Sequence, residues 1–244
     1  MTEAEVELLR FEYLKVAATD DTDHYYGAWI GGPKRLGGHP AFSSGPRPAP
    51  VSVSGWPGQP GPGLPAVIPK VQEAVLGDRN PYETGIVLDD QGNTIIAHKG
   101  STDFVQFTPD DIDRMRGATL IHNHPSGWLL PDGDPEHRSS GFSPDDIGLA
   151  VTADLAEIQA VTPTRIFSLR PGPKGWPSPA SVTWAYREAE RTIRERFQKR
   201  IIGGWKPWGD TEALRTKWAN SEHHDAVARM VAKKFGWQYQ VVQR

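Results

Sequence analysis

Hydrophobic residues recur at steps of three and four along several segments, the spacing that places them on one face of a helix. The stripe over residues 66–76 ends at Gly77, and glycine commonly closes helices. At Thr108 and at Ser143, a residue that caps helices is followed three positions later by aspartate, which marks the first turn of a helix. The pattern therefore predicts these helices: 1–20, 66–76, one from 108, one from 143, 180–201 and 221–235.

Shorter apolar runs bounded by turn-forming residues predict strands. Residues 82–88 and 94–98 flank the sequence Asp-Asp-Gln-Gly-Asn, which is typical of the turn of a β-hairpin. Residues 118–121 form a short apolar strand that leads into His122. The other predicted strands are 103–107, 157–162, 165–169 and 237–242. Helices mixed with strands and hairpins, without an internal repeat, predict an α/β fold.

Residues 27–65 differ from the rest of the chain, because they contain 10 Gly and 9 Pro. Proline removes a backbone donor and glycine adds backbone entropy, so such a stretch sustains neither a helix nor a central strand. It is a linker or, as its scattered apolar residues favour, an irregular wrap that lies partly against the body. The predicted organisation is an N-terminal helix over 1–20, a wrap over 21–65, a core over 66–170 and a C-terminal helical extension over 171–244.

The composition excludes several kinds of functional site. The chain has 244 residues, a net charge of −3 and no cysteine. The lack of cysteine excludes a disulfide scaffold, a cysteine-ligated zinc site, an iron–sulfur centre and a thiol nucleophile, so a metal would have to bind histidine and carboxylate side chains. The net charge gives no global reason to expect a nucleic-acid partner. No apolar run approaches the roughly 18 residues that span a bilayer, and the first residues lack a signal-peptide layout. A soluble cytoplasmic protein without a membrane partner is expected.

The C-terminal part is basic, with 13 Lys and Arg against 7 Asp and Glu over residues 185–244. Such a surface could contact nucleic acid or an acidic partner. A solvated face with pairs such as Glu190–Arg194 and Glu195–Lys199 is the favoured interpretation. His223–His224 lies on the predicted terminal helix without a nearby carboxylate strand, so a surface pair is expected rather than a second metal site. The histidines that belong to no recognisable cluster are His24, His39 and His98.

One segment carries candidate metal ligands: it begins at Ile121 and has the sequence Ile-His-Asn-His-Pro-Ser-Gly. If His122 and His124 end a strand, the two-residue period places both imidazoles on one face and Asn123 on the other. Two imidazoles on one face can share a divalent metal, and Pro125 ends the strand so that the site opens into a loop. Pairs with this spacing also occur on surfaces and in cores, so a third ligand is needed.

Asp146 is the candidate third ligand, in the sequence Ser143-Pro-Asp-Asp at the start of a predicted helix. The same pattern is an ordinary capping box. The chain repeats it from Thr108 to Asp111, and no histidine is expected beside that copy. Two histidines and one carboxylate would leave the fourth position of a tetrahedral zinc for water, the layout of a catalytic site.

A hydrolytic zinc site also needs a base that takes a proton from water. Glu83 is the candidate, because it is an acidic residue at the head of the apolar strand predicted over 82–88. A carboxylate needs a reason to occupy such a position. The alternative is that Glu83 merely borders the sheet.

These residues occur in the order of a known motif: Glu83, His122, His124, Pro125, Ser143 and Asp146. The motif resembles that of the JAMM (MPN+/JAB) zinc metallopeptidases. The sequence His-Asn-His-Pro-Ser-Gly is most similar to that of the bacterial RadC-like branch. The resemblance covers about residues 66–170. It implies a curved mixed β-sheet flanked by helices, as in the MPN and cytidine-deaminase-like folds.

The resemblance also implies roles for individual residues. His122, His124 and Asp146 would hold Zn2+, with no other cofactor, and Glu83 would be the general acid and base. Ser143 would help to stabilise the tetrahedral oxyanion by donating a hydrogen bond. The implied reaction is hydrolysis of an amide bond in a protein or peptide, often the isopeptide bond that follows a ubiquitin-like C-terminal tail.

The spacing departs from that family in one place, because 18 residues separate His124 from Ser143. The family usually has a shorter spacer. The excess, residues 128–142, is either a surface loop rich in turn-forming residues or a lid over the site with Trp128 as an apolar anchor. His137 within it is a further candidate metal contact. The insertion leaves the metal motif itself intact.

Two other functions compete with a metallopeptidase. Several relatives of this fold are inactive scaffold modules, although their metal motifs are usually broken and this one is complete. A role in DNA metabolism is suggested by the RadC-like sequence and by the basic C-terminal part, which includes Arg191, Arg194 and Arg200. The complete motif favours the metallopeptidase.

Overall fold

The computed structural model describes residues 64–244 apart from 78–79, 103, 126–140 and 205–211, and gives only the backbone for 201–202 and 212–221. The helix predicted over 1–20, the wrap up to residue 63 and most of the insertion lie outside the described residues. Among the described helices, none is both long and apolar enough to cross a membrane.

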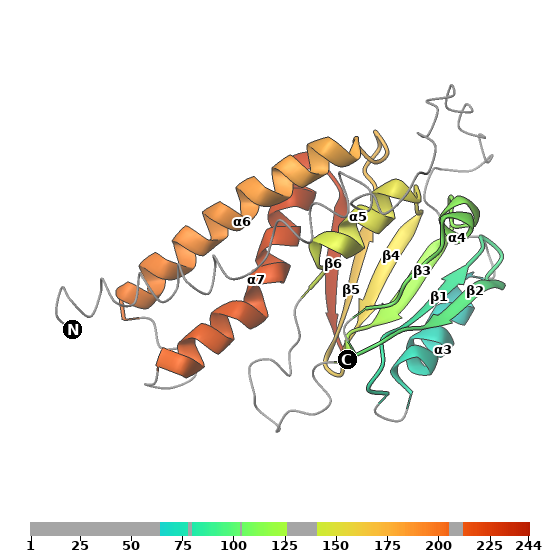
Figure 1. Ribbon diagram of the computed structural model, residues 1–244, viewed down its shortest axis with the longest axis horizontal. Helices are drawn as coiled ribbons and strands as arrows, with labels where there is room; N and C mark the ends of the chain where they lie inside the picture. The colour runs from blue at the N-terminus through green and yellow to red at the C-terminus, as the bar shows by residue number, and fades with distance from the viewer. Residues whose placement is uncertain (1–63, 78–79, 103, 126–140, 205–211) are drawn as a thin grey trace, which may run out of the picture. The chain divides into compact units, whose positions relative to one another are not determined.

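A six-stranded sheet in the order β2-β1-β3-β4-β5-β6 forms the centre of the described chain (Figure 1). Strands β3 and β4 run parallel, and the other neighbouring pairs are antiparallel. Helices flank this mixed sheet, so the predicted α/β class is confirmed. The strands are β1 (Thr84–Leu88), β2 (Thr94–Lys99), β3 (Thr119–Asn123), β4 (Glu157–Val161), β5 (Arg165–Arg170) and β6 (Gln238–Gln243).

Strands β1 and β2 form the predicted hairpin. Its turn is held by Asp89, whose carboxylate accepts hydrogen bonds from the backbone N–H groups of Gln91 and Asn93 at 2.9 and 2.8 Å. Gly92 takes a φ of 89° in this turn, a conformation that other residues rarely adopt. The local sequence therefore determines the turn, as the hairpin motif predicts.

The strand predicted over 103–107 is wrong, because its described residues form no strand. The chain bends back at Gly100, where an added Cβ atom would lie 2.0 Å from the carbonyl oxygen of Phe104. The apolar residues that suggested a strand, Val105 and Phe107, instead pack their side chains onto β1. The apolar run is therefore a packed loop.

Helix α3 (Leu64–Leu76) covers one face of the sheet, over β1, β3 and β4. Its buried Val71 and Val75 join a core cluster with Leu88 and Ile121. Gly77 ends the helix with a positive φ of 52°, as the sequence predicts.

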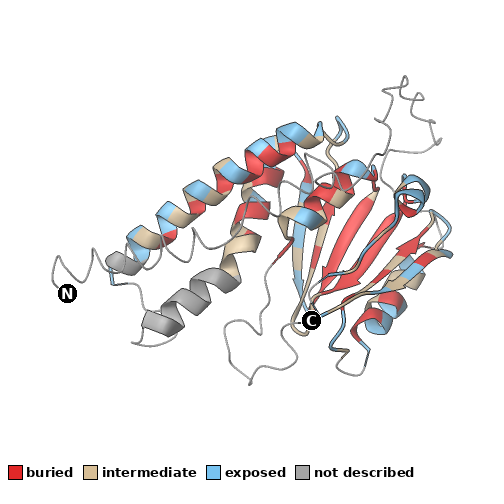
Figure 2. Ribbon diagram, viewed as in Figure 1, coloured by how far each residue is buried: buried red, intermediate tan, exposed pale blue. Residues whose placement is uncertain are grey.

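The opposite face carries the larger core, beneath α5 (Pro144–Thr152), α6 (Pro179–Ile202) and α7 (Glu212–Phe235). Leu120, Ile147, Phe167 and Tyr186 are fully buried there. Because helices lie on both faces, every residue of β3 and β4 is buried (Figure 2). The short helix α4 (Pro109–Arg114) packs beside β2, where Arg114 donates to the carbonyl of Ile95 at 2.6 Å.

The C-terminal residues complete the sheet. Helices α6 and α7 pack along each other, and β6 pairs antiparallel with β5. The two helices and the strand predicted after residue 179 are confirmed, but α7 begins at Glu212 rather than at 221. The added turns are rich in strong helix formers such as alanine, leucine and arginine.

Charged side chains on α6 and α7 pair with one another. Arg191 lies 3.5 Å from Glu195 within α6, and Lys234 of α7 lies 2.7 Å from Glu188. Arg191 and Lys234 therefore have acidic neighbours on the helix surfaces. These two pairs differ from the pairs expected from the sequence.

Candidate metal centre

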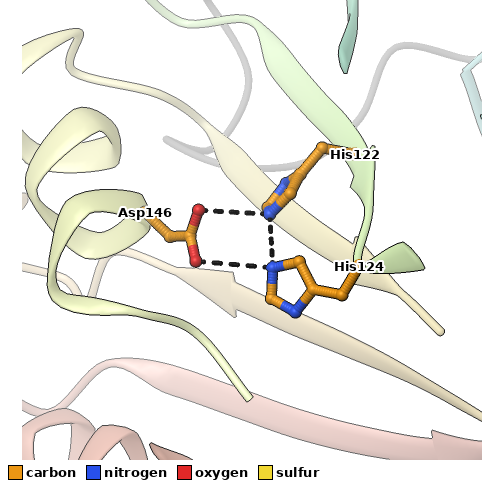
Figure 3. A group of neighbouring side chains, drawn as sticks. All are labelled: His122, His124 and Asp146. Atoms are coloured by element: carbon orange, nitrogen blue, oxygen red, sulfur yellow. Dashed lines mark hydrogen bonds and ion pairs between the residues drawn. The ribbon is translucent and has the colours of Figure 1, made fainter. Parts of the chain in front are cut away.

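The C-terminal end of β3 and the N-terminal end of α5 bring together three side chains that could hold a metal ion (Figure 3). His122 lies in β3, His124 follows it directly, and Asp146 lies in the first turn of α5. The backbone N–H of His124 donates to the carbonyl of Val161 at 3.0 Å, which continues the pairing with β4 past the end of the strand. Both imidazoles therefore share a face of the sheet, as the two-residue period predicts.

The three side chains face one another at short distances. The Nε2 atoms of His122 and His124 lie 3.0 Å apart. Oδ1 of Asp146 lies 3.2 Å from Nε2 of His122, and Oδ2 lies 3.6 Å from Nε2 of His124. A tetrahedral zinc with bonds of about 2.0–2.2 Å separates its ligand atoms by about 3.3–3.6 Å. The observed separations bracket that spacing, so the geometry fits a metal site.

Asp146 is fixed by the cap of its own helix. The backbone N–H and the hydroxyl of Ser143 both donate to Oδ2 of Asp146, at 2.7 and 2.8 Å. In return, the backbone N–H of Asp146 donates to Oγ of Ser143 at 3.2 Å. The two interpretations of this motif, as a capping box and as the source of a metal ligand, are therefore compatible. The cap orients the carboxylate toward the histidines.

The surroundings favour the ionised form of Asp146. Burial alone would raise the pKa of Asp146, but the charges and hydrogen bonds of His122 and His124 outweigh it and hold this pKa well below its ordinary value. The ionised carboxylate is the form that binds a metal.

His122 is the most enclosed of the three residues, with 1% of its surface exposed. Its ring centroid lies 6.5 Å from that of Phe142. Its Nδ1 atom is buried and has no hydrogen-bond partner in the described part of the chain. An orphaned buried nitrogen is unusual in folded proteins. The other ring nitrogen, Nε2, faces His124 and Asp146, so the buried ring presents this atom to the candidate metal centre.

Glu83 lies immediately before β1 and is buried. Burial raises the pKa of Glu83, His122 and His124 act against this rise, and the charge of Asp146 adds to it. The carboxyl group also accepts a hydrogen bond from the backbone of Val105. The charges of all three candidate ligands therefore act on Glu83. Glu83 itself is not one of the residues whose ligand atoms converge.

The second capping box differs from the expectation, because a histidine does lie beside it. Nε2 of His98, in β2, is 3.0 Å from Oδ2 of Asp111. Thr108 donates to the same oxygen from its backbone and its hydroxyl, as Ser143 does in α5. The hydrogen bonds from Thr108, together with His98, lower the pKa of Asp111 to about 2. No third metal ligand joins this pair among the described residues.

The expected surface pair His223–His224 is also wrong. The side chain of His223 is only 14% exposed and its Nε2 lies 3.9 Å from Oε1 of Glu190. Nδ1 of His224 is buried, without a hydrogen-bond partner in the described residues. Burial and the charge of His223 lower the pKa of His224 to about 4, and His124 and Asp146 also act on it. Helix α7 therefore contributes a neutral imidazole near the metal centre, and no local motif marks it.

The loop that leads into Ser143 packs against the C-terminal elements. An added Cβ on Gly141 would lie 3.0 Å from Cα of Asp225 in α7 and 3.1 Å from the hydroxyl of Tyr239 in β6. That hydroxyl donates to Oδ1 of Asp225 at 2.5 Å, and the rings of Phe142 and Tyr239 lie 6.2 Å apart. The C-terminal elements therefore support the loop that precedes the third ligand.

The structure thus brings the predicted residues His122, His124, Asp146, Ser143 and Glu83 into one region, whereas Trp128 and His137 lie outside the described residues. Comparisons with protein-family models, with curated proteins and with solved structures found no match.

Proposed function

We propose that this protein is a zinc-dependent metallopeptidase that hydrolyses an amide bond. The convergence of His122, His124 and Asp146 carries the proposal, since their ligand atoms all lie within 4.8 Å of one another. The buried carboxyl group of Glu83 beside them supports it. The order of these residues along the chain, which resembles the motif of the JAMM zinc metallopeptidases, supports it further.

The donor set fits zinc. Two imidazole nitrogens and one carboxylate oxygen are ligands that zinc accepts, whereas calcium and magnesium prefer oxygen ligands alone. Three protein ligands leave one tetrahedral position open, as in catalytic zinc sites. A bound zinc supplies Lewis-acid chemistry, because it polarises a carbonyl group and lowers the pKa of water.

Glu83 is the proposed general acid and base. Its carboxylate would take a proton from the attacking water and return that proton to the leaving amine nitrogen. A group that does both works best when its pKa lies near the working pH. Burial raises the pKa of Glu83 in that direction.

Ser143 has a supporting role in this proposal. Its hydroxyl donates to Asp146 at 2.8 Å, so its first contribution is to orient a metal ligand. To donate to an oxyanion, as the resemblance implies, the hydroxyl would turn from Asp146 to the substrate. The backbone N–H of Ser143, at 2.7 Å, would continue to hold the carboxylate.

The proposed substrate is a protein or peptide. The isopeptide bond that follows a ubiquitin-like tail is the first bond to test, because the resemblance implies it. A linear peptide of the same tail sequence provides the comparison.

The first test measures the metal. We expect purified protein to hold about one zinc per chain by elemental mass spectrometry. Asp146→Asn should lose this zinc. Asp111→Asn is the matched control, because it changes a capping aspartate that contacts a histidine but has no third ligand among the residues that the structure describes. Asp111→Asn should keep the zinc.

The second test measures hydrolysis of the isopeptide and linear substrates. Zinc-loaded protein should cleave at least one of them, and Glu83→Gln should keep its zinc and lose about 100-fold or more in kcat. A chain that binds no zinc, and whose hydrolysis is unchanged by Glu83→Gln, would refute the proposal. Zinc binding without cleavage of either substrate would favour a non-catalytic scaffold.

A further inference from the structure

Asn123, between the two candidate metal-ligating histidines, is fully buried and uses both ends of its side-chain amide. Oδ1 accepts a hydrogen bond from the backbone N–H of Thr84 at 2.6 Å. Nδ2 donates to the backbone carbonyl of Tyr82 at 3.1 Å. With 0% of its surface exposed, this amide does not contact solvent. Its two partners are the residues on either side of Glu83.

The backbone of Glu83 is thus held from two sides. Its own N–H and C=O bond to residues 100–101, in the turn after β2, both at 2.7 Å. On the opposite side, Asn123 binds the neighbouring backbone groups of Tyr82 and Thr84. The peptide units that carry Glu83 are therefore fixed between the β2 turn and the end of the histidine strand.

The register between β1 and β3 shows what this fixation achieves. The backbone pairing ends with Gly85 opposite His122. If the register continues, Thr84 lies opposite Asn123 and Glu83 lies opposite His124. Residues directly opposite each other in an antiparallel pair share one face of the sheet. A slip of one residue would turn Glu83 to the other face.

We infer that Asn123 is a positioning residue for Glu83. Its amide extends the β1–β3 connection past the last backbone pair and keeps the Glu83 carboxyl on the face of His122, His124 and Asp146. The inference rests on the proposed role of Glu83 as general acid and base. Asn123 itself acts on the backbone and does not touch the reacting atoms.

Asn80 offers a matched control. It also binds the segment around Glu83, since its Nδ2 donates to Oγ1 of Thr84 at 2.9 Å and its Oδ1 accepts from the N–H of Tyr82 at 3.2 Å. It lies before β1, however, and these bonds do not connect the segment to the histidine strand. Asn80→Ala therefore removes hydrogen bonds from the same segment without loosening its tie to β3.

The first test needs no substrate. Full-length protein is loaded with Co2+, and the paramagnetic relaxation of the Glu83 carboxyl carbon is measured by NMR. The signal is identified by its loss in Glu83→Gln. This relaxation falls steeply with distance from the metal. We expect Asn123→Ala to reduce it severalfold and Asn80→Ala to leave it near the wild-type value. Wild-type relaxation in Asn123→Ala overturns the inference.

The second test is kinetic. On a substrate that the zinc-loaded protein cleaves, Asn123→Ala should lower kcat by about 10- to 100-fold, with zinc affinity and KM little changed. Added to Glu83→Gln, it should cause no further loss, because it acts through Glu83. An equal loss in both backgrounds overturns the inference. If no substrate is cleaved but the relaxation changes as expected, the proposed function fails and the positioning role of Asn123 stands.

Discussion

Asp146 uses its two carboxylate oxygens differently. Oδ2 accepts both donors of Ser143 and so belongs to the helix cap, while Oδ1 faces His122 at 3.2 Å. A carboxylate held in this way loses little rotational freedom when a metal binds. The helix cap thereby becomes the support of a candidate metal ligand.

Ser143→Ala should therefore weaken zinc binding by about 10-fold, the usual effect of removing a group that orients a metal ligand. Loss of the cap should also cost about 1 kcal/mol of unfolding free energy. Competition with a chelator measures the affinity, and urea unfolding of the zinc-free protein measures the stability.

Thr108→Ala is the control for Ser143→Ala, because Thr108 caps α4 through the same bonds to Asp111. It should cost a similar stability and leave the zinc affinity unchanged. Equal zinc affinities in the two variants would show that the cap of α5 does not support the metal ligand.

Sequence reasoning at this scale predicts what depends on local spacing. The shared face of His122 and His124 follows from a two-residue period, and the cap of Asp146 follows from its four-residue motif. Asn123 is different, because its partners Tyr82 and Thr84 lie on another strand. Their contact arises from the strand register, which no local pattern contains.

At the scale of elements, two polar contacts join β2 and α4. His98 lies 3.0 Å from Asp111, and Arg114 donates to the carbonyl of Ile95 at 2.6 Å. Asp111 also holds the cap of α4. The hydrogen bonds from Thr108 and the contact with His98 lower the pKa of Asp111 to about 2. The ionised carboxylate is therefore more favourable in the folded chain than in the unfolded one.

The sign of the pH effect follows from this lowered pKa. The stabilisation by Asp111 is complete above the unfolded pKa of about 4 and is lost as the pH falls from about 4 toward 2. The urea midpoint of the wild type should exceed that of Asp111→Asn at pH 6, and the difference should shrink over this window. A difference that stays constant down to pH 2 would contradict the ionised contact.

The elements themselves follow closely from hydrophobic periodicity and caps. The hairpin of β1 and β2, the helices α3 and α5, and the central strands lie where the pattern predicts them. The exception at 103–107 has a physical cause, because Gly100 allows a close backbone approach to Phe104 that turns the chain. Apolar residues after such a turn pack as a loop while keeping the pattern of a strand.

At the scale of the described chain, the predicted core and C-terminal extension share one sheet. Strand β6 pairs with β5 along its length, and Tyr239 of β6 contacts Phe142 in the loop before α5. His224 is half-buried near the metal centre for the same reason, because α7 packs against that loop. The sequence suggested a surface position for His224. Which face of a helix is buried depends on the elements that pack against it, and the sequence of the helix alone does not show them.

Gly141→Ala tests this coupling. The new Cβ would lie 3.0 Å from the Asp225 backbone, so α7 or the loop would have to shift. Such overpacking typically costs about 1–3 kcal/mol. We expect a lower melting temperature of the zinc-free chain, by calorimetry, and weaker zinc binding. An unchanged melting temperature would show that the loop and α7 are not tightly packed.

The contact of Gly141 with Asp225 and Tyr239 also bears on biosynthesis. The loop before Ser143 leaves the ribosome well before α7 and β6 are translated. Until they emerge, this loop lacks the surface that packs against it, and Asp146 follows the loop directly. The three ligands therefore reach their final arrangement only after α7 and β6 have emerged. Metal acquisition is expected to follow their emergence, and a ribosome stalled before α7 should carry a nascent chain that retains little zinc.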